Sequence, residues 1–357
     1  MTKMKAKMKK SEAAGICSGI NSRVPRELML ETAHMLENAS SWVIFSHVNP
    51  DGDSLGSTGA LFGAGLARGK RVRWLSVDPI PAKYLFLPHV EECETQKKYT
   101  FDSKDDLYVF LDSANEGRGV EGLKERSPGT VVLNIDHHED NTGFGTLNCV
   151  DGRASSTSEV LWHIMTEAGW AITPAIAECL YTGVAADTGW FSFGNTTSGA
   201  HMMAADLLSK GADPVKIDSC LRHNRSVEGA RLWALAFLRI FRWGEASQFA
   251  MTWLSRRDFD VTGSVSSDTE TLVNQMLMIR GVSLAVLLTE DSGEERMNAS
   301  FRSKAGSVAA ASVARALGGG GHPKAAGACL ASPLGEAIRI VQETVDKIYA
   351  EWALADR

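Results

Sequence analysis

Aspartate and histidine residues follow four predicted elements of this sequence, at the point where each element ends. They are His47, Asp51, Asp53, Asp112, Asp136, His137, His138 and Asp187. Carboxylates and imidazoles without thiolates are the donors that cations such as Mn²⁺ and Mg²⁺ prefer. Four of the carboxylates, Asp51, Asp53, Asp112 and Asp187, would balance the charge of two divalent ions. Two such ions about 3.5–4 Å apart can deprotonate a bridging water and clamp a phosphate for in-line attack.

The elements that precede these residues explain why the residues should meet. Predicted strands cover Trp42–Ser46, Leu107–Leu111 and Val131–Ile135, and a predicted helix covers Pro174–Ala186. In an open parallel sheet, ligands bind outside the carboxyl ends of the strands, so three strands deliver Asp or His to one edge. Each feature alone is most often structural, since Asp-Gly-Asp is typical of a turn or an N-cap. Their coincidence at four element ends favours a metal site.

Apolar runs alternate with helical stretches over most of the chain. This pattern indicates an α/β fold with a mostly parallel sheet covered by helices on both faces. Near residue 226 the pattern changes to that of a second, smaller α/β domain. The predicted division is a disordered basic tail at 1–24, a large domain at 25–225, a helical linker at 226–245 and a small domain at 246–357.

Composition restricts the classes of function open to the chain. Its 357 residues carry a net charge of −6, although five lysines lie within the first ten residues. An acidic body argues against a broad surface for long nucleic acid, but not against a pocket for a small anion. The chain has no run of 18 apolar residues that would predict a membrane span. Six scattered cysteines, with no Cys-x-x-Cys pair, are typical of a reducing compartment. We therefore expect a cytoplasmic protein without a membrane partner.

Four stretches of the chain resemble, in order, the four motifs of the DHH phosphoesterase superfamily. They read HVNPDGDSLGS, LDSAN, NIDHHEDN and GVAADTGWFSFGNTT. A fifth stretch, SVAAASVARALGGGGHPKAAG, resembles the signature of the C-terminal domain associated with that superfamily. A compact chain of this length is most similar to the branch that degrades very short RNA and dephosphorylates pAp. RecJ exonucleases carry additional domains, and family II pyrophosphatases have a different C-terminal domain.

The resemblance implies a role for each residue of the cluster. It assigns one metal ion to His47, Asp51 and Asp112, and a second to Asp53, His137 and Asp187, with Asp112 bridging both. Asp136 would orient a histidine, and His138 would face the substrate phosphate. Asp112, Asp136 and His138 are thus the predicted catalytic residues. The resemblance implies two Mn²⁺ ions per site, with Mg²⁺ or Co²⁺ as alternatives.

A glycine-rich loop and a strand of the small domain carry further candidates. The four glycines before His322 would let backbone N–H groups approach an anion, and Arg302 can bind a phosphate bidentately. Taken alone, the loop is as well explained as a helix end, and Asn298–Arg302 as a solvated edge strand. In the resembled family both line a substrate cleft between the two domains. The predicted substrate-binding residues are therefore His138, Asn298, Ser300, Arg302, Gly320, Gly321, His322 and Lys324. Ser155–Ser158 is predicted as a helix N-cap cluster, with contact to the phosphate as the alternative.

These features predict a Mn²⁺-dependent phosphoesterase that acts on short single-stranded RNA, on the 3′-phosphate of pAp, or on both, and not on long duplex DNA. The alternative is a phosphodiesterase for cyclic dinucleotides of the c-di-AMP type. A polyphosphatase or pyrophosphatase fits the GGGGH loop less well. A non-catalytic nucleotide-binding module would usually lack a ligand, whereas all six are present. A homodimer is expected from the family and from the apolar residues Trp233, Phe237 and Phe241.

Overall fold

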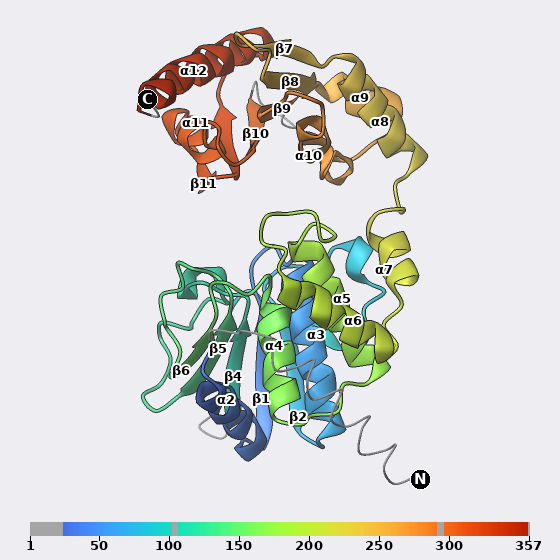
Figure 1. The fold of residues 1–357 in the computed structure, drawn as a ribbon, viewed down its shortest axis with the longest axis vertical. Coiled ribbons are helices and arrows are strands. Elements are labelled where there is room, and N and C mark those ends of the chain that lie inside the picture. Colours follow the sequence, from blue (N-terminus) through green and yellow to red (C-terminus); the bar gives the residue numbers. More distant parts are fainter. Residues whose placement is uncertain (1–23, 102–105, 291–295, 356–357) are drawn as a thin grey trace, which may run out of the picture. The chain divides into compact units, whose positions relative to one another are not determined.

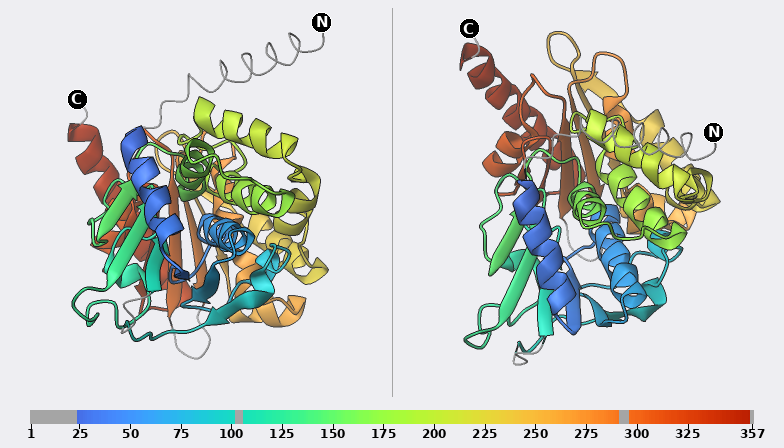
Figure 2. Two further views of the ribbon diagram at one scale, coloured as in Figure 1. Left: turned by 90° about the horizontal axis from the view of Figure 1, so that it is seen from below. Right: turned by 60° about the horizontal axis from the view of Figure 1, so that its bottom comes forward.

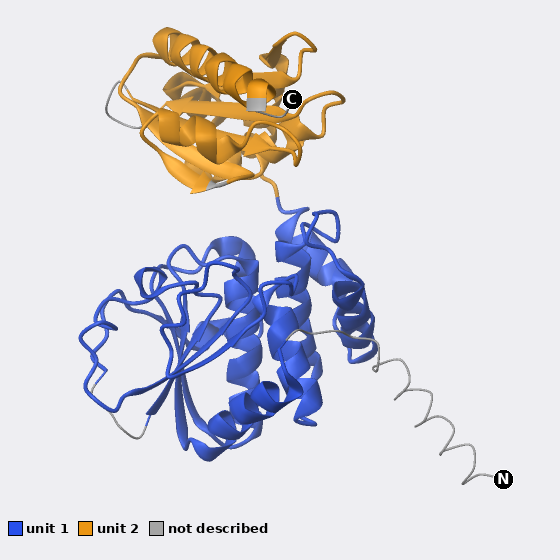
Figure 3. Ribbon diagram, turned by 60° about the vertical axis from the view of Figure 1, so that its left-hand side comes forward, with its two compact units in different colours: residues 1–224 blue, residues 225–357 orange. Residues whose placement is uncertain are grey.

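The computed structural model describes residues 24–101, 106–290 and 296–355. The chain divides into two compact units, residues 1–224 and 225–357 (Figure 3), and each is described below by itself. The predicted basic tail lies outside the described residues, apart from Val24. None of the described helices is both long and apolar enough to cross a membrane.

The first unit is built on a six-stranded sheet in which every pair of neighbours is parallel (Figure 1). Its strands, in spatial order, are β3 (Cys93–Thr95), β2 (Arg71–Ser76), β1 (Ser41–Ser46), β4 (Asp106–Leu111), β5 (Val131–Asp136) and β6 (Leu147–Val150). The strands β1, β4 and β5, which the sequence predicts to carry the site residues, are adjacent. The α/β fold with a parallel sheet is therefore confirmed, and the three strand ends open side by side.

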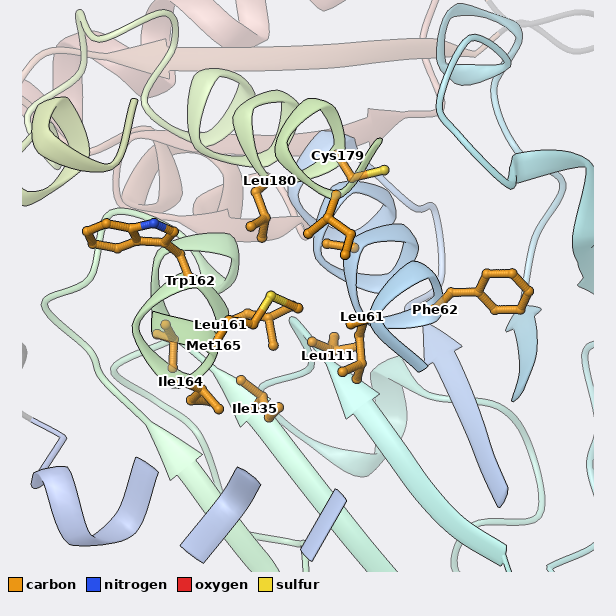
Figure 4. Packing of buried hydrophobic residues seen from close by; sticks show 14 of the residues in the cluster. Leu61, Phe62, Leu111, Ile135, Leu161, Trp162, Ile164, Met165, Cys179 and Leu180 are labelled. Carbon is orange, nitrogen blue, oxygen red and sulfur yellow. The ribbon is translucent and has the colours of Figure 1, made fainter. Parts of the chain in front are cut away.

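Helices cover one face of this sheet. They are α2 (Arg26–Asn38), α3 (Gly52–Ala67), α4 (Thr157–Glu167), α5 (Pro174–Asp187), α6 (Ser198–Ser209) and α7 (Pro214–Leu221). Most begin at a residue suited to capping, since Asp51, Ser156, Thr173, Thr197 and Asp213 each accept a hydrogen bond from a first-turn amide. Between α3, α4 and the sheet, Leu61 and Leu161 pack toward Leu111 and Ile135 (Figure 4).

The opposite face of the sheet carries an aromatic cluster instead of helices. Phe45 stacks on Phe110 at 4.6 Å between ring centroids, and Phe101 and Tyr108 complete the group. Among the described residues, the covering segments are loops and short 3₁₀ turns, so the prediction of helices on both faces was wrong (Figure 2). On this face the connection from β4 to β5 supplies Val120 and Leu123, and a single 3₁₀ turn, η3 (Glu116–Arg118), takes the place of a crossover helix there.

The second unit contains a mixed sheet with helices around it. Its strands, in spatial order, are β11 (Gly320–His322), β12 (Ala325–Leu330), β10 (Met297–Ser303), β9 (Leu284–Glu290), β8 (Phe249–Leu254) and β7 (Phe241–Trp243). Its helices are α8 (Val227–Leu238), α9 (Arg256–Thr262), α10 (Leu272–Leu277), α11 (Ala310–Ala316) and α12 (Leu334–Ala355). The segment predicted as a linker supplies α8 and β7, and Leu232 of α8 is fully buried in this unit. Part of the predicted glycine-rich loop forms β11, which pairs with β12.

Helices α3 and α5 of the first unit pack closely against each other. A Cβ on Gly56 would lie 2.5 Å from the carbonyl oxygen of Cys179 and 2.9 Å from the amide nitrogen of Gly183. One turn earlier, a Cβ on Gly52 would collide with Ala186. The two helices therefore touch backbone to backbone and run antiparallel. This contact brings the start of α3 beside the end of α5, where two of the predicted metal ligands lie.

Gly56→Ala should destabilise the first unit, because the added methyl group has no space to enter. Overpacking of this kind costs about 1–3 kcal/mol of unfolding free energy. Chemical denaturation followed by circular dichroism measures the change. Gly335→Ala in α12 is the matched control, because a Cβ there meets no atom within 4 Å. Equal stability of wild type and Gly56→Ala would contradict the tight helix contact.

Candidate metal centre

Three residues that follow adjacent strands meet at the carboxyl edge of the first sheet. The Nε2 atom of His47, after β1, lies 3.1 Å from Oδ2 of Asp112, after β4. The Nε2 atom of His137, after β5, lies 3.5 Å from Oδ1 of the same carboxylate. His47 and Asp112 are only 1% and 2% exposed. Asp112 adopts a left-handed backbone conformation, with φ of 57°, which turns its side chain between the two histidines.

The remaining predicted ligands surround this core. Oδ1 of Asp51 lies 3.8 Å from Nε2 of His47, and Oδ2 of Asp187 lies 3.7 Å from Nε2 of His137. Asp53 is buried, and its carboxylate accepts hydrogen bonds from the backbone amides of Thr157 at 2.6 Å and Ser158 at 3.0 Å. The structure thus brings together all six residues that the sequence predicts as metal ligands.

Two groups of side chains within this cluster offer ligand atoms close enough to hold an ion. One contains His47, Asp51 and Asp112, and the other contains Asp112, His137 and His138. Asp112 belongs to both groups, as its predicted bridging position requires. The second group includes His138, which the sequence predicts to face the substrate, and does not include Asp53 or Asp187. The division of ligands between two ions therefore stays a prediction.

The carboxylates of the cluster repel one another strongly. Burial, reinforced by the charges of Asp112 and Asp187, holds the pKa of Asp53 well above its ordinary value. Burial and the charge of Asp112 also raise the pKa of Asp187 to about 6, although His137 opposes this. Burial alone would raise the pKa of Asp112, but the neighbouring His47 and the charge of His137 lower it. The raised pKa values show that ionising all of these carboxylates together is unfavourable. The site therefore lacks positive charge.

The histidines are oriented to present one nitrogen each. Nδ1 of His47 lies 2.6 Å from the carbonyl oxygen of Val48, and Nδ1 of His137 lies 3.4 Å from that of Ala154. When each Nδ1–H donates to its carbonyl, the lone pair of Nε2 points at the carboxylates. Burial lowers the pKa of His137, but the charges of Asp112, Asp53 and Asp187 outweigh it and raise that pKa to about 9. The donor types and their orientation fit a divalent cation.

Asp136 and His138 form a separate pair at the edge of the cluster. Asp136 is fully buried, and its carboxylate lies 2.8 Å from Nδ1 of His138 and accepts a 2.6 Å hydrogen bond from Asn141. This contact fixes the ring of His138, so that its Nε2 atom faces away from Asp136. It is the contact that the predicted orienting role of Asp136 requires.

The segment that begins α4 touches more of the ligands than the sequence indicates. Besides the two amides bound to Asp53, the hydroxyl group of Thr157 donates to Oδ1 of Asp112 at 3.0 Å. Asn195 links the carbonyl oxygen of Ser155 to Oδ2 of Asp187, at 3.0 and 3.2 Å. The sequence predicts Ser155–Ser158 as a cap or as a phosphate contact, and Ser156 does cap the helix. The pattern Ser-Ser-Thr-Ser gives no sign of which residues lie opposite it.

Arg118 is a second residue that sequence reasoning missed. Its Nη2 atom lies 3.1 Å from Nε2 of His47, and its Nη1 atom lies 3.2 Å from Nε2 of His138. It sits on the 3₁₀ turn η3 (Glu116–Arg118), seven residues beyond the end of β4. Its position after the LDSAN motif is the only signal that could have identified it.

In the second unit, strand register gathers the predicted substrate-binding residues. Asn298, Ser300 and Arg302 alternate along β10 with the buried residues of the core. Arg302 pairs with Ala325 of β12, which in turn pairs with His322 of β11, and Ser300 is related to Gly320 through Gly327 in the same way. Burial lowers the pKa of Arg302, and Lys324 is exposed. The side chain of His322 lies outside the described part of the structure.

Comparison with known proteins identifies the family to which both units belong. Residues 41–184 match the model of the N-terminal domain of the DHH family, and residues 260–351 match that of the DHHA1 domain. A bifunctional oligoribonuclease and PAP phosphatase NrnA from Thermus thermophilus is 33% identical over 288 residues, which cover 80% of this chain and 83% of that protein. The protein of the same description from Bacillus subtilis is 28% identical, over 84% of this chain and 92% of that one.

A solved structure supports the fold over nearly the whole chain. An exopolyphosphatase-related protein from Bacteroides fragilis superposes with a TM-score of 0.85 at 24% identity, and the match covers 93% of this chain and 99% of the other. The matches to the two family models and to the relative from Thermus thermophilus confirm the resemblance found in the sequence motifs. The chain belongs to the DHH family of phosphoesterases and carries a DHHA1 domain after its DHH domain.

Proposed function

We propose that this chain is a metal-dependent phosphoesterase that hydrolyses very short RNA, removes the 3′-phosphate of pAp, or does both. The observation that carries the proposal is the convergence of His47, Asp112 and His137 from three adjacent strand ends, with a carboxylate between two imidazoles. The relatives from Thermus thermophilus and Bacillus subtilis are described as oligoribonucleases and PAP phosphatases, which supports the choice of substrate.

The residues of the cluster would have different roles. His47, Asp51, Asp53, Asp112, His137 and Asp187 would hold two Mn²⁺ ions, which when bound supply an activated water and charge for the phosphoryl oxygens. Thr157 holds the Asp112 carboxylate in place through its hydroxyl group. Asp136 fixes the ring of His138, and Nε2, which contacts Arg118 in this structure, would bind a phosphate or the oxygen of the leaving group.

The second unit would bind the substrate by its phosphate. Asn298, Ser300 and Arg302 share the face of β10 that the core leaves open, and β12 separates them from the glycines of β11. Gly320 has no atom within 4 Å of an added Cβ, so a phosphate can reach its backbone. Together with Gly321, His322 and Lys324, these residues are the proposed substrate-binding set.

Removal of charge from Asp112 should abolish hydrolysis. Asp112→Asn is preferable to Asp112→Ala, because Asn tolerates the left-handed backbone that this position adopts. Metal-stripped protein with Mn²⁺ restored would be assayed on a 5′-labelled RNA dinucleotide and on pAp. We expect turnover of at least one substrate by wild type and none by the variant. Asp140→Asn, which alters an exposed carboxylate near the site, is the control and should remain active.

Failure of wild type to turn over either substrate, despite binding Mn²⁺, would contradict the proposed substrates. The same assay with a cyclic dinucleotide or with polyphosphate would then identify which other phosphoester or phosphoanhydride is cleaved. Full activity of Asp112→Asn would contradict the proposed metal centre itself.

Metal affinity should rise with pH. In the metal-free site His137 has a pKa of about 9 and Asp187 a pKa of about 6, so a cation must displace protons from both groups at low pH. We expect the Mn²⁺ association constant to increase by up to about tenfold per pH unit for each proton displaced, between pH about 6 and 9. Isothermal titration calorimetry in buffers of different ionisation enthalpy counts the protons released. A pH-independent affinity would show that these residues do not bind the ion.

Arg302→Met should weaken substrate binding without altering the metal centre. Loss of a charge-assisted hydrogen bond to phosphate corresponds to an increase in KM of about tenfold or more. Arg315→Met, on α11 of the same unit, is the control for a general loss of positive charge. An unchanged KM for Arg302→Met would remove this residue from the substrate-binding set.

A further inference from the structure

The contacts that Arg118 makes with the metal centre are unusual for an arginine side chain. Both side-chain hydrogen bonds that it makes among the described residues end on imidazole nitrogens, of His47 and His138. A half-buried guanidinium usually pairs with a carboxylate or a phosphate, which its planar fork fits and whose charge balances its own. Nitrogen acceptors on two separate rings offer neither advantage.

The backbone that carries Arg118 is held in place from several sides. Its carbonyl oxygen accepts a 2.9 Å hydrogen bond from the amide of Val48, in the loop that follows β1. The side chain of Asn115 caps the turn by accepting from the amide of Gly117 at 3.0 Å. Glu116 forms a 2.6 Å ion pair with Arg126. The guanidinium is therefore placed at the centre by a tethered turn, not by a loose surface loop.

The hydrogen bond to His47 is incompatible with metal binding. When Nδ1–H of His47 donates to Val48, Nε2 has one lone pair, which either accepts from Arg118 or binds a cation. A metal ion that takes this lone pair must release Arg118. The guanidinium would then keep its hydrogen bond to His138 but lie beside two divalent cations whose charge the carboxylates already balance, so that an additional anion would stabilise it there.

We propose that Arg118 is a phosphate-binding residue of the first unit. It hydrogen-bonds to Nε2 of His47 in this structure, and would bind a phosphoryl oxygen of the substrate when His47 holds an ion. This inference rests on the proposed function, because the anion is the phosphoester that the metal centre would cleave. The ligand class is a phosphate monoester or diester, as found at an RNA linkage or on pAp.

The test compares Arg118→Met and Arg118→Lys with wild type in the full-length protein. Mn²⁺ binding is measured by calorimetry without substrate, and the binding of AMP and the KM for pAp or an RNA dinucleotide are measured with Mn²⁺ present. Arg118→Met should bind Mn²⁺ at least as tightly as wild type, because a competing cation is gone. Its affinity for AMP should fall and its KM should rise by about 10- to 100-fold, the loss expected for a charged hydrogen bond.

Two control variants separate this role from others. Arg118→Lys keeps the charge but not the fork, so its KM should lie between those of wild type and Arg118→Met. Arg153→Met removes an exposed arginine from the loop after β6 and should change neither measurement. Weaker Mn²⁺ binding by Arg118→Met with an unchanged KM would overturn the inference, because Arg118 would then serve only to orient His47.

The outcome also distinguishes this inference from the proposed function. Hydrolysis by wild type together with an unchanged KM in Arg118→Met contradicts the role of Arg118 and leaves the proposed function intact. If wild type cleaves neither RNA nor pAp, yet binds AMP in the presence of Mn²⁺ and loses that binding in Arg118→Met, the substrate assignment fails and the role of Arg118 stands.

Discussion

Repulsion among the carboxylates of the metal centre is the constraint on which the structure of the first unit depends. Asp53, Asp112 and Asp187 share one small volume, and each has a different partner that reduces the cost of burial. The positive end of α4 faces Asp53, the imidazoles of His47 and His137 flank Asp112, and Asn195 donates to Asp187. These partners are insufficient, since the pKa of Asp187 stays at about 6. The protein itself thus leaves a deficit of positive charge that a divalent cation would fill.

The geometry of the centre depends on contacts in which side chains play little part. Asp53 lies in the first turn of α3 and Asp187 ends α5, and these two helices meet through glycines. A backbone contact of this kind has few adjustable atoms, so the separation of the two carboxylates follows from helix packing. Asp112 is positioned in a similar way by its own left-handed backbone conformation, directly after β4. The centre is therefore positioned by main-chain geometry, and its side chains are short.

Residues at the ends of regular elements could be predicted from the sequence, and residues held by irregular backbone could not. His47, Asp112 and His137 follow apolar strands, and parallel strands open at one edge, so their convergence is a consequence of topology. Arg118 depends on a hydrogen bond from the distant amide of Val48, which no local pattern reveals. The helices expected on both faces of the sheet, and the loop expected at Gly320, were misjudged for a related reason. The conformations of the β4–β5 connection and of the glycine-rich strand β11 depend on tertiary context more than on intrinsic preference.

The contact between α4 and Asp53 has a consequence for how the centre can be observed. The amide protons of Thr157 and Ser158 are bound to a carboxylate whose protonation and ligation change with the state of the centre. Their chemical shifts and their rates of exchange with solvent are therefore coupled to that state, although neither backbone nitrogen is itself a ligand. The first turn of α4 thus provides two backbone amides whose NMR signals report the occupancy of the centre, with no probe group attached to the protein.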